Sequence, residues 1–370
     1  MKNILITGGA GFIGSHLCDE LLNKGYTVRV LDNLSEQVHG ANCSRPTYLN
    51  KDVELIEGDV RDPYAVKYAL KNTDAVFHYA AMVGVGQSMY EIKEYTDVNN
   101  LGTAVLMEAL MRQPVEKLIV ASSMSIYGEG MYIDKNGEPA VAEDRSLKQL
   151  KSGNWEIYDE KGHVLQPVPT TEKKTPSLSS VYALSKYDQE RMCLMLGKAY
   201  NIPTVALRFF NVYGTRQALS NPYTGVLAIF ASRLLNNNRP LIYEDGLQKR
   251  DFVSVLDIAR ASRLAMESQV NNEVFNIGSG HAFTICGIAE KLAAILNKQH
   301  LTAEISGKYR VGDIRHCFSD ISKAASLLNF TPEVSLDEGL IELAEWLQGQ
   351  TAEDKISLAT NELAIRGLTV

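Results

Sequence analysis

The chain has 370 residues, which suits two domains, or one large α/β unit with an additional lobe. Apolar residues make up 45% and charged residues 22%, as in an ordinary globular protein, and no apolar run approaches the ~20 residues of a membrane span. The net charge of −7 comes without a basic block, which argues against nucleic acid as a partner.

The cysteines and the N-terminus carry the expectation about location. Five cysteines are scattered along the chain, none of them in a C-x-x-C pair, and no signal segment precedes the first apolar run. We therefore expect reduced thiols in a cytoplasmic protein that neither spans a membrane nor holds a metal ion.

The first 32 residues predict a dinucleotide-binding unit. A strand at 3–7 runs into a loop with Gly8, Gly11 and Gly14, and a helix follows to about residue 23. The glycines leave room for a tight turn, for the approach of a pyrophosphate and for close packing of the helix on the strand. The helix N-terminus attracts the phosphates. Asp32 ends the second strand, where a carboxylate accepts hydrogen bonds from ribose hydroxyls and repels a 2′-phosphate, so NAD is the expected cofactor.

Strand and helix patterns alternate through the first half of the chain. Continuous apolar runs, typical of strands buried on both faces, lie at 3–7, 27–31, 53–56, 75–77, 117–121 and 203–208. Helical stretches at 96–112 and 181–199 lie between them. This alternation predicts an α/β fold of the Rossmann type, a doubly wound parallel sheet.

Two regions depart from this alternation. Residues 129–175 are polar and aperiodic, and too long for an ordinary connection, so we interpret them as a functional loop or a lid. After residue 216, helical stretches at 225–235, 254–267 and 284–296 mix with a short strand at 273–277, which indicates a smaller α+β substrate-binding lobe. The predicted division is an NAD-binding domain at 1–216, with 129–175 inserted and 248–270 returning to it. The other predicted parts are a sugar-nucleotide-binding lobe at 217–247 and 271–347 and a C-terminal tail at 348–370.

A tyrosine, a lysine and a serine form the candidate catalytic group. Tyr182 and Lys186 lie four residues apart, on one face of the predicted helix. An ammonium group beside a phenol favours the phenolate and so lowers the pKa of the tyrosine. Ser122 and Ser123 follow the strand at 117–121, at the sheet edge where such folds bind ligands, and either hydroxyl could bond the reacting group.

With these residues in view, the chain resembles the extended short-chain dehydrogenase/reductase family, the NAD-dependent sugar-nucleotide epimerases and dehydratases. The motifs that carry the resemblance lie at 7–14, 78–81, 99–103, 122–128, 182–186, 208–214, 250–253 and 276–278. The resemblance implies that Tyr182 is the acid/base, that Lys186 tunes its pKa and binds ribose, and that Ser123 orients the reacting hydroxyl. It also implies a homodimer in which the helices at 96–112 and 181–199 pair.

Further contacts follow from the same resemblance. The residues expected at the cofactor are Gly8, Gly11, Phe12, Ile13, Gly14, Asp32, Asn33, Asp59, Val60, Ala80, Ala81, Asn99, Tyr182 and Lys186. Those expected at a nucleoside-diphosphate sugar are Ser125, Asn211, Arg216, Gln217, Arg250 and Arg310. Two alternatives stay open at this point. Asp59 could be a turn residue, and Arg250 and Arg310 could form surface ion pairs.

Two positions after Ser123 select among the family's reactions. The 4,6-dehydratases carry an Asp-Glu pair there, and the sugar-acid decarboxylases carry a Glu two residues after the serine. This chain has Met124 and Ser125, neither of which can exchange a proton as a carboxylate does. The pattern favours 4-epimerisation, in which carbon 4 is oxidised, the 4-keto sugar turns over and re-reduction regenerates the tightly bound NAD. Alternatives are a 4,6-dehydratase or reductase and a non-catalytic NAD-binding regulator.

The insertion at 129–175 and the segment 208–226 most resemble the dTDP-L-rhamnose 4-epimerases. Relatives there often carry a cysteine pair inside the insertion, whereas this chain has no cysteine between Cys43 and Cys193. We therefore expect dTDP-L-rhamnose as substrate, with UDP-glucose, UDP-galactose or a UDP-uronic acid as the alternative.

Overall fold

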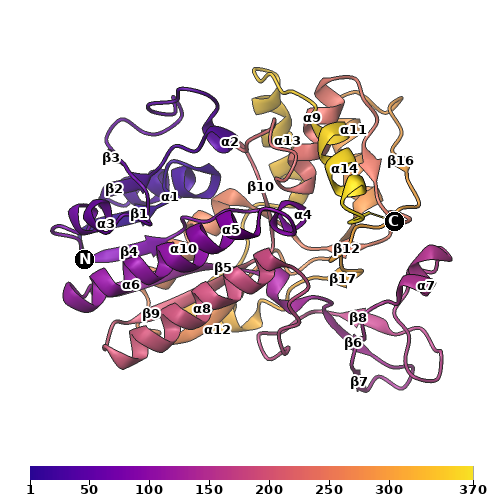
Figure 1. Ribbon diagram of the computed structural model, residues 1–370, viewed down its shortest axis with the longest axis horizontal. Helices are drawn as coiled ribbons and strands as arrows, with labels where there is room; N and C mark the ends of the chain where they lie inside the picture. The colour runs from indigo at the N-terminus through magenta and orange to yellow at the C-terminus, as the bar shows by residue number, and fades with distance from the viewer. Residues whose placement is uncertain (370) are drawn as a thin grey trace.

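A seven-stranded parallel sheet forms the centre of the molecule (Figure 1). The computed structural model describes residues 1–369. The strand order is β14-β9-β5-β4-β1-β2-β3, so the direction of winding reverses between β1 and β4. The strands are β1 (Asn3–Thr7), β2 (Thr27–Asp32), β3 (Glu54–Glu57), β4 (Ala75–His78), β5 (Lys117–Ser123), β9 (Thr204–Phe209) and β14 (Glu273–Ile277). This arrangement confirms the predicted Rossmann-type sheet.

Helices cover both faces of the sheet because alternate strand residues bury apolar side chains on opposite sides. In β1, Ile4 and Ile6 belong to the apolar core on one face and Leu5 to the core on the other, and all three are at most 1% exposed. The first face carries α1 (Phe12–Asn23), α10 (Val255–Glu267) and α12 (Ser322–Leu328). The second carries α3 (Pro63–Ala69), α6 (Gly102–Arg112) and α8 (Val181–Ala199).

Several predicted elements have the expected bounds, and one differs in kind. The helix at 181–199 begins and ends as predicted, with the Ser180 hydroxyl accepting a hydrogen bond from the Ala183 N–H at 3.1 Å. The predicted helix at 96–112 begins instead with a π-helical segment, η1 (Thr96–Leu101), before α6. Strand β5 runs two residues further than expected and so includes Ser123.

The lobe is built on three helices, α9 (Val226–Leu235), α11 (Ile285–Ile295) and α13 (Leu336–Leu347), which share a second apolar core. Ile288 and Leu292 are fully buried in it. Short strands complete the lobe: β10 (Asn211–Tyr213), β11 (Leu241–Ile242), β12 (Lys249–Arg250), β13 (Phe252–Ser254), β15 (Phe283–Thr284), β16 (Glu304–Ile305) and β17 (His316–Cys317). The strand at 273–277, expected in the lobe, lies instead at the edge of the central sheet as β14, paired with β9.

The insertion folds as a small unit of its own. Strands β6 (Met131–Ile133), β7 (Pro139–Ala140) and β8 (Gln166–Val168) form an antiparallel sheet, and α7 (Leu147–Lys151) follows β7. Tyr132, Ile157 and Leu165 form its core. None of residues 129–175, all of them described, lines the cavity at the glycine loop and α8, so this stretch does not form a lid over that cavity in the structure. Residues 172–175 line a second pocket, between the insertion and α8.

The C-terminal tail docks on the body through α14 (Ile356–Ile365), where Ala359 and Leu363 are 6% and 4% exposed. The remaining helices are short: α2 (Glu36–His39), α4 (Val85–Ser88), α5 (Ile92–Tyr95) and η2 (Met124–Tyr127). Within residues 1–369, no helix has the length and the apolar character that crossing a membrane requires.

Candidate active site

A cavity of about 670 Å³ opens where the carboxyl ends of the central strands face the lobe. Its wall begins at the glycine loop after β1, passes the end of β5 and the first turns of α8, and continues into the lobe at α9 and the segment 241–252. Ligands of doubly wound sheets bind at this edge, next to the point where the strand order reverses.

The glycine loop has the shape that a dinucleotide needs. Gly8 has a φ of +70°, and a Cβ there would stand 2.7 Å from the Ala80 backbone nitrogen. A Cβ on Gly14 would stand 2.5 Å from the Gly8 carbonyl oxygen. Gly11 precedes α1 without any side-chain cap, so the first N–H groups of the helix remain available to phosphate. The loop therefore fits the pyrophosphate of NAD.

The Asp32 side chain lies at the next part of the wall. Its carboxylate accepts hydrogen bonds from the Ala10 N–H at 3.0 Å and the Leu34 N–H at 2.9 Å, and the residue is 8% exposed. These bonds hold the carboxylate at the cavity, where it can meet a ribose.

Most of the other predicted cofactor residues line the same cavity, namely Phe12, Ile13, Asn33, Asp59, Val60, Ala80 and Ala81. Hydrogen bonds from Arg61 hold the pKa of Asp59 below its usual value. Asn99 differs, since it is fully buried beneath the wall and bonds to the backbone of Met82 and to the Ser185 hydroxyl at 2.8 Å. Its amide groups join η1 to the Met82 backbone and to α8, and its expected contact with the cofactor stays a prediction.

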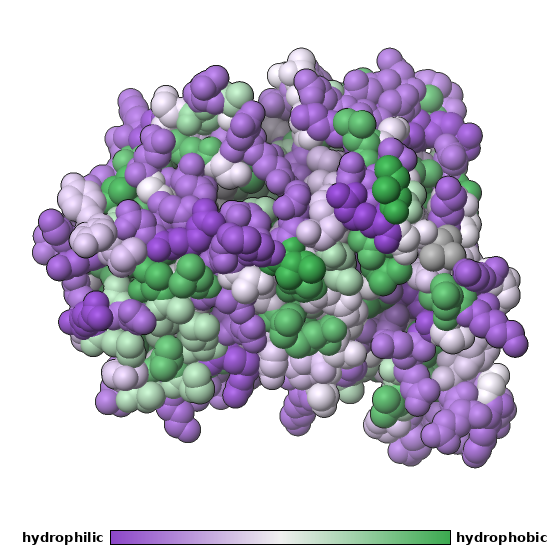
Figure 2. Space-filling view, viewed as in Figure 1, coloured by the Kyte–Doolittle hydropathy of each residue, from purple (hydrophilic) through white to green (hydrophobic). Residues whose placement is uncertain are grey.

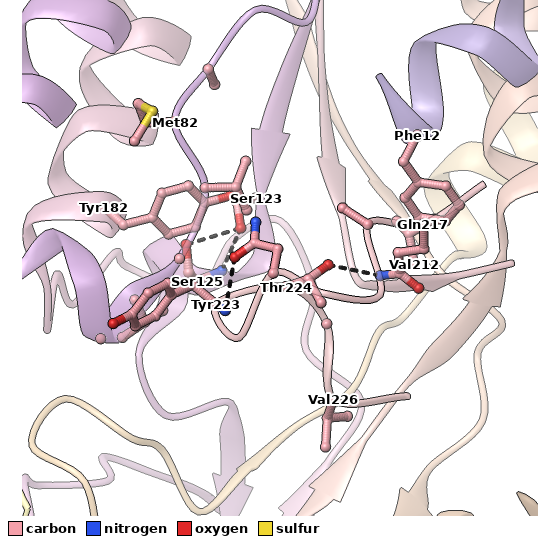
Figure 3. Close-up of a pocket in the computed structure, with 18 of the residues that line it drawn as sticks. Phe12, Met82, Ser123, Ser125, Tyr182, Val212, Gln217, Tyr223, Thr224 and Val226 are labelled. Atoms are coloured by element: carbon pink, nitrogen blue, oxygen red, sulfur yellow. Dashed lines mark hydrogen bonds between the residues drawn. The ribbon is translucent and has the colours of Figure 1, made fainter. Parts of the chain in front are cut away.

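Two of the candidate catalytic residues, Ser123 and Tyr182, lie next to one another at the cavity (Figure 3). Ser123 ends β5 and caps η2, and its Oγ accepts hydrogen bonds from the Ser125 N–H at 3.2 Å and the Ser125 hydroxyl at 2.9 Å. Tyr182 lies in the first turn of α8, where its N–H donates to the Ser88 hydroxyl at 3.0 Å. Burial raises the pKa of Tyr182, and hydrogen bonding with Ser123 opposes that shift.

Lys186 lines the cavity one turn after Tyr182 and is 3% exposed. Burial lowers its pKa to about 8. Its ammonium group donates to the Gln189 Oε1 at 2.7 Å. In the protein alone, burial is the largest influence on the pKa of the Tyr182 phenol, and the lysine is directed toward Gln189, so an effect of Lys186 on Tyr182 stays a prediction.

Behind Lys186 lies a buried polar network that sequence reasoning missed. The Gln189 Nε2 donates to the Thr103 hydroxyl at 2.9 Å, and His78 bonds to both Thr103 and Thr7 at 2.8 and 2.9 Å. The network therefore runs from Lys186 to the end of β1, just before the glycine loop. The available signal was the position of Gln189, three residues after Lys186 and so on the same helix face.

Five of the six residues predicted for the substrate line the cavity: Ser125, Asn211, Gln217, Arg250 and Arg310. The guanidinium of Arg250 donates to the carbonyls of Lys249, Ile314 and Arg315, and Arg310 pairs with Asp313 at 2.9 Å. Within the described chain, the buried Oδ1 of Asn211 and Oε1 of Gln217 have no hydrogen-bond partner. These two atoms could accept hydrogen bonds from a ligand in the cavity.

Arg216 is the exception among them. It does not line the cavity, and its guanidinium pairs with Asp19 of α1 at 2.7 Å. The side chain is directed to α1 in this structure, so a substrate contact from Arg216 would require it to leave Asp19, and that contact stays a prediction.

Comparison with known proteins gives consistent matches. Residues 4–278 match the model of the NAD-dependent epimerase/dehydratase family. A dTDP-L-rhamnose 4-epimerase of Burkholderia thailandensis is 36% identical over 353 residues, which are 94% of this chain and 95% of the relative.

Two solved structures share the fold over nearly their whole length. A UDP-glucose 4-epimerase of Thermotoga maritima with UDP-glucose is 32% identical, with a TM-score of 0.75, and the match covers 94% of this chain and 98% of that one. A UDP-glucuronic acid 4-epimerase of Bacillus cereus, solved with UDP-glucuronic acid and NAD, is 30% identical, with a TM-score of 0.75, and the match covers 94% and 99%.

Proposed function

The chain belongs to the NAD-dependent epimerase/dehydratase family, and on that premise we propose that this NAD-dependent isomerase is a 4-epimerase of dTDP-L-rhamnose. Its product would be dTDP-6-deoxy-L-talose. The support for this sugar is the likeness to the Burkholderia enzyme over 94% of the chain. The alternative is a UDP-glucose, UDP-galactose or UDP-uronic acid substrate, supported by the relatives solved with UDP-glucose and UDP-glucuronic acid.

The choice of 4-epimerisation rests on the described residues around Ser123, none of which supplies a free carboxylic acid. Met124 is buried, and the Ser125 hydroxyl donates to Ser123 rather than presenting an acid. The carboxylates on the described cavity wall are Asp32, Asp59, Glu94 and Asp313, and each is already engaged: Asp32 by Ala10, Asp59 and Glu94 by Arg61, Asp313 by Arg310. A dehydration needs a further acid and base, whereas a 4-epimerisation needs a single group that takes and returns one proton.

In the proposed mechanism, Tyr182 and Ser123 act on the 4-hydroxyl of the sugar. Ser123 hydrogen-bonds this hydroxyl and orients it, and Tyr182, as the phenolate, takes its proton. The glycine loop and Asp32 would hold NAD, which would supply the acceptor and later the donor of the hydride at carbon 4. The 4-keto sugar turns within the cavity so that carbon 4 presents its opposite face, and Tyr182 returns the proton to the oxygen on carbon 4. Lys186 holds a positive charge next to the reacting groups throughout.

The nucleoside diphosphate would be held at the lobe. Arg250 and Arg310 can grip phosphate with paired N–H groups, and the free Oδ1 of Asn211 and Oε1 of Gln217 add acceptors for hydroxyl or N–H groups. These contacts come from the lobe, whereas Ser123 and Tyr182 belong to the sheet domain. The sugar could therefore turn while its diphosphate stays bound.

The test is to incubate purified protein with dTDP-L-rhamnose, UDP-glucose and UDP-glucuronic acid and to follow the products by NMR. We expect dTDP-6-deoxy-L-talose at equilibrium with its epimer, without accumulation of NADH. A 4-keto-6-deoxy sugar, or NADH released in stoichiometric amount, would contradict 4-epimerisation. Comparing the rise in melting temperature with thymidine and uridine diphosphate at equal concentration separates the two nucleotides.

We also propose that the protein is a homodimer. The helices concerned, η1 with α6 and α8, present exposed apolar side chains, among them Leu101, Leu184 and Met195, which are 50%, 47% and 61% exposed. Figure 2 shows apolar side chains gathered on the face of the molecule that carries these helices. Burying them against a second copy would remove them from water.

A further inference from the structure

We infer that helix α14 forms the outer wall of the nucleotide-sugar site and that Leu363 limits the size of the sugar that can turn there. The inference rests on the proposed function, since it assigns to the C-terminal tail a role in choosing the substrate of the same site. It concerns a segment to which neither the family motifs nor the catalytic group extends.

One face of α14 lines the cavity and the other faces water. Ile356, Ala359, Thr360 and Leu363 belong to the cavity wall, at spacings of a helical face. Leu358 and Ile365, on the other face, are 68% and 72% exposed. The helix thus contributes an apolar strip to a cavity that Ser123, Tyr182 and Lys186 also line.

Leu363 lies one layer away from the catalytic tyrosine. A Cβ placed on Gly86 would stand 3.4 Å from the Leu363 Cδ2, so the leucine packs directly on this glycine of α4. Ser88 belongs to the same short helix and accepts the hydrogen bond from the Tyr182 N–H. Leu363 and Tyr182 are therefore both in contact with α4, and both line the cavity.

The helix is fixed at both ends, so it can act as a defined wall. Before α14, the Asp354 carboxylate accepts a hydrogen bond from the Asn238 amide at 2.7 Å, and the Glu353 N–H donates to the Ser220 hydroxyl at 3.0 Å. After it, the Val311 N–H donates to the Leu368 carbonyl at 2.8 Å. Figure 1 shows α14 beside the helices of the lobe, with the C-terminus close to them.

Two aromatic contacts continue the wall toward the expected diphosphate site. The Arg366 guanidinium stacks on the Tyr90 ring at 4.5 Å, and the Arg310 guanidinium lies over the Tyr243 ring at 5.7 Å. The Tyr243 hydroxyl meets the Thr360 hydroxyl of α14 at 3.5 Å. A residue predicted to hold phosphate, Arg310, is thus joined to α14 through one tyrosine ring.

A 4-epimerase has to give the sugar room to present both of its faces without losing it to water. The width of the cavity between α14 and the catalytic side therefore decides which sugars can turn. Gly86 has no side chain that could narrow the cavity, whereas the four side-chain carbon atoms of Leu363 do narrow it. We expect a bulkier substituent on the sugar to collide with the leucine first.

The experiment compares Leu363→Ala with wild type on UDP-glucose and UDP-N-acetylglucosamine, which differ by an N-acetyl group. If Leu363 limits sugar size, the ratio of kcat/KM for the N-acetylated to the plain sugar rises by about tenfold, the discrimination that a few apolar atoms give. Leu358→Ala, on the exposed face of the same helix, is the matched control and leaves the ratio unchanged. An equal ratio in both variants overturns the inference.

The design separates this inference from the proposed function. If the wild type turns over neither these two sugars nor dTDP-L-rhamnose, the proposed function fails. The size limit is then measured as the ratio of Kd values for the two UDP-sugars by calorimetry on the NAD-loaded protein. Leu363→Met keeps the volume of the side chain and should keep the wild-type ratio. If it does, the changed ratio in Leu363→Ala comes from the lost side-chain volume. Melting temperatures of the variants check directly that the fold is kept.

Discussion

At the scale of single residues, the chemistry depends on the Tyr182 hydroxyl, whose pKa is raised by burial and lowered in part by its hydrogen bond with Ser123. We expect Tyr182→Phe to lower kcat by roughly 10²- to 10⁴-fold, the usual worth of general acid–base catalysis. NAD content, measured after denaturation, should stay at the wild-type level. Tyr187→Phe, on the same helix but outside the cavity wall, serves as the control. Full activity of Tyr182→Phe would assign the proton transfer to another group.

The Lys186 ammonium carries a cost in stability that depends on pH. Its pKa falls from 10.5 to about 8 on folding because burial disfavours the charge, so the unfolded chain binds this proton more tightly. The resulting destabilisation is complete below pH 8 and disappears as the pH rises toward 10.5. We expect Lys186→Met to increase the free energy of unfolding at neutral pH by at most about 3 kcal/mol. The gain is reduced by the cost of leaving the Gln189 Oε1 without its hydrogen bond.

Urea unfolding of Lys186→Met and wild type at pH 7 and pH 10 measures this difference. The gain should be clear at the lower pH and small at the higher one. Gln189→Met provides a second comparison, since it removes the partner of the ammonium and leaves the charge. A stability difference that is equal at both pH values would mean that burial of the charge is not what Lys186 contributes.

At the scale of elements, α8 is held on the sheet by a buried ion pair. The Glu190 carboxylate receives Arg208 of β9 at 2.6 and 2.9 Å and the Ser122 hydroxyl of β5 at 2.6 Å, and Glu190 and Arg208 are 1% and 5% exposed. Removing one partner leaves the other charge buried, which typically costs about 3–5 kcal/mol. We expect that loss for Glu190→Gln, together with lower activity, because α8 carries Tyr182.

Chemical denaturation with a double-variant cycle checks this role. The pair Glu190→Met and Arg208→Met should recover much of the stability that either single change loses, because no unpaired charge remains. Glu54→Gln is the control, since the Glu54 carboxylate that pairs with Arg29 is half exposed, and screening by water leaves such pairs little weight. Additive losses in the double variant would show that the two residues act separately.

The elements also show how far local sequence goes. The strands of the central sheet and the helix at 181–199 were predictable because apolar runs and helical spacing are local signals. The partner of a strand is not local: nothing in residues 273–277 says that Ile277 pairs with Phe209 of the central sheet. For the same reason, the motif predicted Lys186 as a candidate catalytic residue, but its hydrogen bond to Gln189 and the docking of Leu363 on Gly86 required the fold.

At the scale of the whole molecule, the candidate site is shared between two bodies. The glycine loop and Tyr182 belong to the sheet domain, whereas Arg250 and Arg310 come from segments next to the lobe. Arg315 lies at the junction, fully buried, and pairs with Glu156 of the insertion at 2.6 Å and with Glu244 at 3.1 Å. The insertion therefore braces the lobe from outside the cavity, which explains why a long polar segment folds here without lining the site.

The proposed homodimer predicts the mass of the protein in solution. Light scattering should give twice the chain mass of 40.9 kDa. Met195→Glu places a charge among the exposed apolar side chains of α8 and should shift the protein to monomer, since an unpaired charge in an interface costs several kcal/mol. The control is Leu327→Glu. Leu327 is 49% exposed and lies on α12, which covers the opposite face of the sheet, so this change should leave the dimer intact. A monomeric wild type, or a dimeric Met195→Glu, would place any association on another surface.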